Sequence, residues 1–227
     1  MTGLEELDGK PYGTPVYLAY EAPEIRRREV LRYAGVRADA AKKTSNDGSG
    51  QTDMADGMEA LLEDVIRQAS DALTYRAACL RLTLDAGAKE LSLAEYFSAS
   101  GNLMKNLSGC SEVILFAATV GAGIDRLIRR YERIEPARSL LFQAYGAERV
   151  ESLCDLINQD INRCVSEFGW STHPRFSPGY GDLSLEIQPV LLSLLDAERR
   201  LGITLGTSLL MSPSKSVTAV IGLEKTE

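Results

Sequence analysis

The residue types with the clearest chemical use lie between Arg175 and Gly181, which read Arg-Phe-Ser-Pro-Gly-Tyr-Gly. A guanidinium, a hydroxyl and a phenol are separated there by a proline and a glycine. Pro178 holds φ near about −65° and Gly179 tolerates positive φ, so the pair suits the centre of a type II turn. Such a turn could direct Arg175 and Tyr180 into one space. The same pattern also suits a plain connector with a solvated arginine, because Pro-Gly turns are common between helices.

A second segment in the C-terminal third gives this turn a context. Residues 205–219 read Leu-Gly-Thr-Ser-Leu-Leu-Met-Ser-Pro-Ser-Lys-Ser-Val-Thr-Ala. Together the two segments resemble the activation domain of cobalamin-dependent methionine synthase. In that family an Arg-x-x-Pro-Gly-Tyr turn precedes a helix and then a Thr-x-Ser-x-x-Met-x-Pro-x-x-Ser-Val-type strand-turn-strand segment. The resemblance is strongest over residues 137–223 and weak before residue 112.

The resemblance implies an α+β fold, with a twisted, mostly antiparallel sheet and helices packed around it. It implies a cytoplasmic accessory component of methionine biosynthesis rather than a complete enzyme. Such a component binds S-adenosylmethionine and supports reductive methylation of cob(II)alamin to methylcobalamin. The cobalamin itself is carried by the partner, which is a separate methionine synthase or another corrinoid protein. A flavodoxin-like or ferredoxin-like protein would donate the electron.

The resemblance also assigns roles within the turn. Arg175 matches the family arginine that grips the ligand's carboxylate through two parallel hydrogen bonds, which lysine cannot reproduce. Ser177, Pro178 and Gly179 form the part of the turn that would offer backbone groups to the nucleoside. Tyr180 would lie over the sulfonium and near the upper face of the corrin, where its ring could contribute cation–π attraction and steric positioning. We therefore assign Tyr180 as the catalytic residue.

A carboxylate should face the cationic end of the ligand. Glu151, on a long predicted helix, matches a family glutamate at this place. If that helix is aligned one position differently, Ser152 occupies the site, and Glu148 or Asp155 lies one turn away. A solvated helix carboxylate is the plain alternative for Glu151.

Two features of the family module have no match in this sequence. The family binds the ligand's amino group with an early Asp in an Asp-Trp context, whereas Trp170 is the single tryptophan here. The family module also continues past its last strand with a tyrosine pair, whereas this sequence reaches Glu227 soon after Gly222. We therefore expect a free-standing activation domain with a missing or rebuilt part of the pocket. A docking or regulatory module for a corrinoid protein that does not bind S-adenosylmethionine is the alternative, and an unrelated enzyme on the same scaffold is a third.

Composition excludes several other classes of protein. The 227 residues suit a single domain, and their 44% hydrophobic and 25% charged composition is ordinary for a globular protein. A net charge of −7 argues against a general nucleic-acid binder. No apolar run approaches about 18 residues, and the polar N-terminus has no signal-peptide core, so neither a membrane span nor secretion is expected. The four cysteines are expected to be free thiols, and His173, as the single histidine, argues against a protein-ligated metal site.

Apolar periodicity predicts the elements that position these residues. Helices are expected at about 24–33, 56–73, 91–107 with a break near Gly101, 124–131, 136–167 and 184–200. Strands are expected at 16–20, 75–84, 113–120, 204–211 and 216–223. Residues 1–55 are otherwise expected to be partly irregular, with a flexible loop near 42–52. The sequence Gly121-Ala122-Gly123 predicts a tight turn rather than a phosphate loop, because no third glycine or Lys-Ser/Thr pair follows it.

Overall fold

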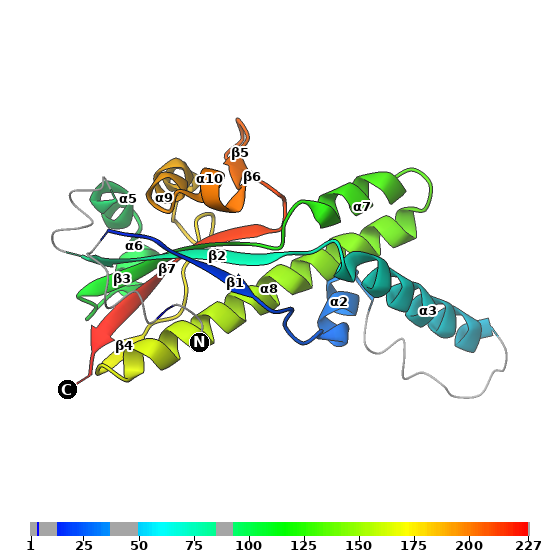
Figure 1. Ribbon diagram of the computed structural model, residues 1–227, viewed down its shortest axis with the longest axis horizontal. Coiled ribbons are helices and arrows are strands. Elements are labelled where there is room, and N and C mark those ends of the chain that lie inside the picture. The colour runs from blue at the N-terminus through cyan, green and yellow to red at the C-terminus, as the bar shows by residue number, and fades with distance from the viewer. Residues whose placement is uncertain (1–3, 5–12, 37–49, 85–92, 227) are drawn as a thin grey trace.

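The computed structural model describes residue 4 and residues 13–36, 50–84 and 93–226. Its centre is a sheet of five strands in the order β1-β2-β3-β7-β4 (Figure 1). Every neighbouring pair is antiparallel, which confirms the expected antiparallel sheet. The strands are β1 (Val16–Tyr20), β2 (Tyr75–Thr83), β3 (Glu112–Thr119), β4 (Trp170–Thr172) and β7 (Ser216–Lys225). The short edge strand β4 is an element that the sequence analysis missed.

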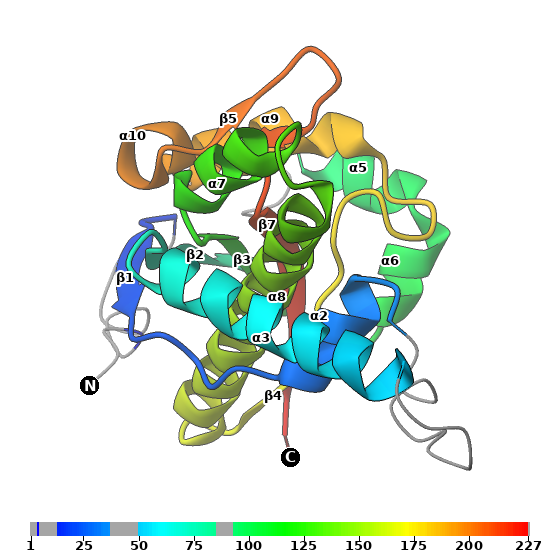
Figure 2. The same cartoon turned by 90° about the vertical axis from the view of Figure 1, so that its right-hand side faces the viewer.

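Helices cover both faces of this sheet, so the fold is α+β as expected (Figure 2). The long helix α8 runs along one face (Figure 1), together with three others. These four helices are α2 (Arg27–Tyr33), α3 (Gly50–Ser70), α7 (Gly123–Tyr131) and α8 (Pro136–Ser166). The opposite face is covered by α5 (Ala94–Ala99), α6 (Gly101–Asn106), a 3₁₀ turn η2 (Leu185–Ile187), α9 (Gln188–Leu194) and α10 (Ala197–Leu201).

The strand β3 shows why the core has two layers. Its residues are buried along the whole strand, as its nearly continuous apolar sequence predicts. Side chains alternate between the two faces of a strand, so Ile114 and Phe116 belong to the cluster under α8. Val113 and Leu115 belong to the cluster under α9 and α10. The sheet is therefore a partition between two hydrophobic cores.

The prediction of one strand over residues 204–211 is wrong. Two short strands, β5 (Thr204–Leu205) and β6 (Met211–Ser212), pair with each other in a separate two-stranded sheet. Between them the chain reverses, with Leu209 at a φ of 60° and its N–H donating to the Gly206 carbonyl at 3.0 Å. A residue in the left-handed region cannot continue an extended strand. The segment predicted as one strand therefore forms a hairpin.

The helix predicted over residues 184–200 is divided in two. Ser184 caps its start, because the serine hydroxyl accepts a hydrogen bond from the Glu186 N–H at 3.1 Å. Asp196 then adopts a φ of 47° and ends α9, and α10 follows until Gly202. The Asp196 carboxylate accepts a hydrogen bond from Arg199 at 2.8 Å, which stabilises the bend between α9 and α10. Asp is one of the few residues that enters the left-handed region readily, so the break has a local cause.

The first residues of two helices also differ from the expected ones. The helix α3 begins at Gly50 rather than near residue 56, so residues 50–52 of the predicted loop are helical. The rest of that loop, residues 42–49, lies outside the described residues. The first helix begins at Arg27 instead of residue 24. The break predicted within residues 91–107 is confirmed, because α5 and α6 are separated at Ser100.

Candidate functional site

The turn that contains Pro178 has the geometry predicted for it. Gly179 has a φ of 86°, and the Tyr180 N–H donates to the Ser177 carbonyl at 3.1 Å, as in a type II turn. The Gly179 N–H donates in turn to the Leu183 carbonyl at 2.8 Å. The turn is therefore fixed by its own backbone hydrogen bonds.

The segment before the turn is fastened to β7. Phe176 and Val220 exchange two backbone hydrogen bonds of 2.8 Å, and the His173 N–H donates to the Gly222 carbonyl at 2.9 Å. The Phe176 side chain is buried in the hydrophobic core that lies between the sheet and helices α9 and α10. Arg175 lies between these two attachment points, so its backbone position is set by the edge of the sheet.

The Arg175 side chain reaches α8 and contacts two carboxylates. One terminal nitrogen donates to Asp155 Oδ1 at 2.8 Å and the other donates to Glu151 Oε2 at 2.6 Å. Burial opposes the charge of Arg175, but the hydrogen bond to Asp155 and the negative charges of both acids outweigh it and raise the pKa of Arg175. The structure thus brings together Arg175 and Glu151, and it adds Asp155, which the sequence analysis placed one turn away.

The remaining acidic alternative is engaged elsewhere. Glu148 is fully buried, and its carboxylate accepts hydrogen bonds from Arg149 at 2.6 Å and from the Ser152 hydroxyl at 2.6 Å. Arg149 also donates to the Pro23 carbonyl at 2.5 Å. Glu148 and Ser152 therefore belong to a buried structural cluster, and among the contacts of the described residues neither pairs with Arg175.

Arg26 is a residue of this site that the sequence analysis missed. It precedes α2 and donates to Asp155 Oδ2 at 2.8 Å and to Glu148 Oε1 at 3.2 Å. Burial opposes its charge, but hydrogen bonds to Glu148 and then Asp155 raise the pKa of Arg26. Arg26 is one of three consecutive arginines, so its sequence gives no sign of which one would reach a helix more than a hundred residues away. We call Arg26, Arg175, Glu151 and Asp155 the Arg175 cluster.

Tyr180 lies on the surface, at the end of the turn that follows Arg175. The residue is 68% exposed, and its ring packs edge-on against Phe176, with 5.4 Å between ring centroids. Ser177 and Pro178 are partly buried. A tyrosine that is held at one edge and otherwise open is suited to contacting a second molecule.

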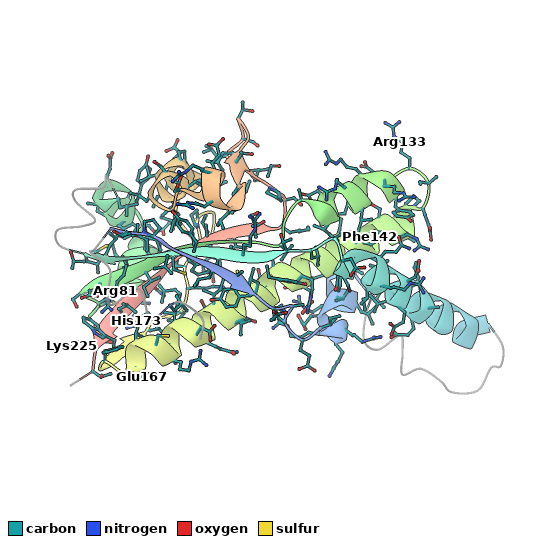
Figure 3. The ribbon with its side chains drawn as sticks, viewed as in Figure 1. Arg81, Arg133, Phe142, Glu167, His173 and Lys225 are labelled. Atoms are coloured by element: carbon teal, nitrogen blue, oxygen red, sulfur yellow. The ribbon has the colours of Figure 1, made fainter. Side chains whose placement is uncertain are left out.

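His173 links three elements just before Arg175. Its Nδ1 contacts the Asn106 carbonyl at 2.5 Å and its Nε2 contacts Glu224 Oε2 at 3.0 Å. Figure 3 shows His173 at the end of the molecule where Lys225 closes β7 and Glu167 follows α8. Both ring nitrogens can donate only in the protonated imidazole. The contacts with Glu224 and then Asn106 accordingly raise the pKa of His173 above 6.5.

His173→Asn is expected to remove a pH-dependent part of the stability. Because the pKa of His173 is raised in the folded state, its contribution is fully present below the unfolded-state pKa of about 6.5. The contribution is lost as the pH rises through the folded-state pKa. Urea unfolding at pH 6.0 and at pH 8.5 should show a larger loss for the variant at pH 6.0, of less than about 1 kcal/mol for this partly exposed pair. An equal loss at both values would contradict the assignment.

Other possible sites are separate from the Arg175 cluster. A cleft of about 490 Å³ lies between α9, α10 and β5 and includes Asp196 and Thr204, but none of the predicted site residues. Within the described residues, no group of three or more His, Cys, Asp or Glu side chains could hold a metal ion. In the same part of the chain, no helix combines the length and apolarity that a membrane crossing requires. Cys79, Cys110 and Cys154 are free thiols, as expected.

Comparison with known proteins supports the fold. No protein-family model matches the sequence, and no curated protein is significantly similar to it. The structure, however, is similar to the solved structure described as the MetH reactivation domain bound to AdoHcy, with a TM-score of 0.60 and 13% sequence identity. The match covers 92% of this chain and 78% of the other. This chain therefore has the fold of the MetH reactivation domain.

Proposed function

We propose that this protein binds S-adenosylmethionine at the Arg175 cluster and supports reductive methylation of cobalamin on a partner protein. The observation that carries the proposal is the meeting of Arg175 with Glu151 and Asp155, at 2.6 and 2.8 Å, in this fold. The similar reactivation domain is described as bound to AdoHcy, the demethylated form of the same ligand. The arginine also belongs to a Pro-Gly-Tyr turn, as in the family that the sequence resembles.

The side chains of the cluster fit the amino-acid end of this ligand. That end carries one carboxylate and one ammonium on the same carbon, and the sulfonium adds a fixed positive charge. A guanidinium can bind the carboxylate through two hydrogen bonds, and carboxylates can accept from the ammonium. In the structure both terminal nitrogens of Arg175 form ion pairs with Glu151 and Asp155. Ligand binding would therefore replace these ion pairs by pairs of Arg175 with the ligand's carboxylate and of an acid with its ammonium. The exchange keeps opposite charges adjacent at each step.

The turn would position the rest of the ligand. The Gly179 N–H is already bonded to Leu183, so we assign the Gly179 carbonyl, which has a second lone pair, as the backbone group for the nucleoside. Ser177 and Pro178 hold this carbonyl in place through the turn. Tyr180, which is 68% exposed, would lie between the ligand and the docking partner.

The proposed reaction asks little acid–base chemistry of this chain. S-adenosylmethionine supplies a methyl group on a good leaving group, and the partner's reduced corrinoid supplies the nucleophile. The residues of this chain would bind the amino-acid end, orient the sulfonium toward the partner and exclude water. A site built from an arginine, two carboxylates and an exposed tyrosine is sufficient for those tasks.

A specific observation favours the second candidate, a docking module that does not bind S-adenosylmethionine. Arg175 is already paired with two acids, and Arg26 adds another positive charge beside them. In such a module the cluster would only brace the loop that carries Tyr180. The two candidates differ in whether the Arg175 pairs exchange with a ligand.

Calorimetric titration with S-adenosylmethionine distinguishes the candidates. Saturable binding is expected, and Arg175→Ala should weaken it by at least ~1.4 kcal/mol, about tenfold, because a charge-assisted pair is lost. Arg175→Lys should recover only part of the affinity, since lysine cannot make paired hydrogen bonds. Arg163→Ala is the matched control, because Arg163 forms an ion pair with Asp160 but is 63% exposed.

Each result has a definite reading. If the free chain does not bind, the titration is repeated with the cobalamin-binding region of a methionine synthase that lacks its own activation domain. Binding of S-adenosylmethionine only in that mixture would mean that the partner completes the pocket. Association with the partner without ligand binding would support the docking module, and no association at all would reject both candidates.

A further inference from the structure

Asp155 is held from two sides by arginines that come from distant parts of the chain. Arg175 donates to its Oδ1 and Arg26 donates to its Oδ2, both at 2.8 Å. Glu151, by contrast, has an ion pair with Arg175 alone among those that the structure gives for the described residues. The two acids of the cluster are therefore not equivalent, although both are about 40% exposed.

We propose that Asp155, rather than Glu151, receives the ammonium of the ligand's amino-acid end, and that Arg26 is its positioning residue. The inference rests on the function proposed above. When Arg175 turns to the ligand's carboxylate, Asp155 loses one partner and keeps the other. Arg26 then holds Oδ2 in place, and the freed Oδ1 can accept from the ammonium. Glu151 would be left with no arginine to orient it.

The charges of the surrounding residues permit this arrangement. Three arginines (Arg26, Arg149 and Arg175) contact three carboxylates (Glu148, Glu151 and Asp155), so the group is neutral before binding. The amino-acid end of the ligand adds one charge of each sign and keeps the balance. Arg26 is itself shared with the fully buried Glu148, which limits its repulsion of a nearby ammonium.

A further acceptor lies three residues along the same helix. Asn158 is three residues beyond Asp155, so it projects from nearly the same face of α8 one turn along. Its buried side-chain oxygen has no hydrogen-bond partner in the structure. An ammonium carries three hydrogens, so a carboxylate and a neighbouring amide oxygen together suit it better than a carboxylate alone.

A ligand series tests the assignment by calorimetry. Three ligands are titrated: S-adenosylmethionine, its decarboxylated form, and 5′-dimethylthio-5′-deoxyadenosine, which keeps the sulfonium but lacks both the carboxylate and the ammonium. Asp155→Asn should weaken the binding of S-adenosylmethionine and of its decarboxylated form by about tenfold. It should weaken the binding of the third ligand, which has no ammonium, by less than about twofold. Glu151→Gln tests the competing assignment and should not show this selective loss, and Arg163→Ala, outside the cluster, is the control. Arg175→Ala should affect S-adenosylmethionine far more than the two ligands without a carboxylate.

The positioning role of Arg26 has its own readout. Arg26→Gln should weaken only the two ligands that carry the ammonium, by about threefold or more, and Arg26→Lys should restore most of the affinity. A merely structural role would weaken all three ligands alike. Asp155→Glu provides a second variant that keeps the charge, and thermal unfolding of each variant checks that it is folded.

The outcomes separate this inference from the proposed function. If wild type binds S-adenosylmethionine but Asp155→Asn weakens all three ligands equally, or none, the Asp155 assignment is wrong. If Glu151→Gln shows the selective loss instead, Glu151 is the ammonium acceptor. If wild type binds none of the three ligands, with or without the partner, the proposed function itself fails.

Discussion

Arg149→Met is expected to lower the free energy of unfolding by about 3–5 kcal/mol, the usual cost of removing one partner of a buried ion pair. Arg149 and Glu148 have side chains that are 1% and 0% exposed. The guanidinium also donates to the Pro23 and Glu24 carbonyls, at 2.5 and 2.7 Å. The variant would leave these acceptors and a buried carboxylate without their main donor, because methionine fills space but donates nothing.

Urea unfolding of wild type and variant measures this loss. The control is Arg163→Ala, which removes a surface pair and should cost less than about 1 kcal/mol. The double variant Glu148→Gln/Arg149→Met should cost less than the sum of its single changes, because the stranded negative charge is gone. A loss for Arg149→Met no larger than that of Arg163→Ala would show that Arg26 and Ser152 satisfy Glu148 on their own.

This cluster also explains how the N-terminal segment is connected to the site. Arg149 binds the backbone just before α2, and Arg26, three residues after Pro23, binds Glu148 and Asp155. The buried Glu148–Arg149 pair therefore sets the position along α8 at which Arg26 contacts this helix. Stability of the core and geometry of the Arg175 cluster depend on the same few residues of one helix.

The sequence predicted best those elements whose pattern is set by local burial. The periodic apolar residues of α8 and the unbroken apolar run of β3 gave nearly correct boundaries. The turn at Pro178 and Gly179 was also predictable, because only a few residues adopt its dihedral angles. In each case the signal lies within one continuous segment.

The residues that were missed depend on contacts between distant segments or on single backbone angles. Arg26 and Asp155 are 129 positions apart, and no local pattern links them. The choice between Glu151 and Asp155 could not be made either, because successive turns of one helix face present both to the same guanidinium. Leu209 and Asp196 broke a predicted strand and a predicted helix through positive φ, which an apolar pattern does not reveal.

Gly123→Ala is expected to destabilise the protein by at least about 3 kcal/mol, above the usual cost of overpacking a core. An alanine Cβ at this buried first residue of α7 would stand 1.9 Å from the Ala72 carbonyl oxygen and 2.7 Å from its carbon. These are backbone atoms, so neither can move aside as a flexible side chain could. Relief would require shifting α7 away from the end of α3.

Gly57→Ala is the matched control, because it makes the same chemical change inside α3. Nothing lies within 4 Å of a Cβ there, so alanine should stabilise the helix by about 0.5–1 kcal/mol. Opposite signs for the two variants in urea unfolding would establish that Gly123 serves close packing. The Gly-Ala-Gly sequence would then be the tight turn that its neighbours indicate, since a Cβ added at Gly121 would also stand 2.5 Å from Thr74 Oγ1. Normal stability of Gly123→Ala would mean that the close approach to Ala72 is not required, and a role for these glycines in binding a phosphate would again need testing.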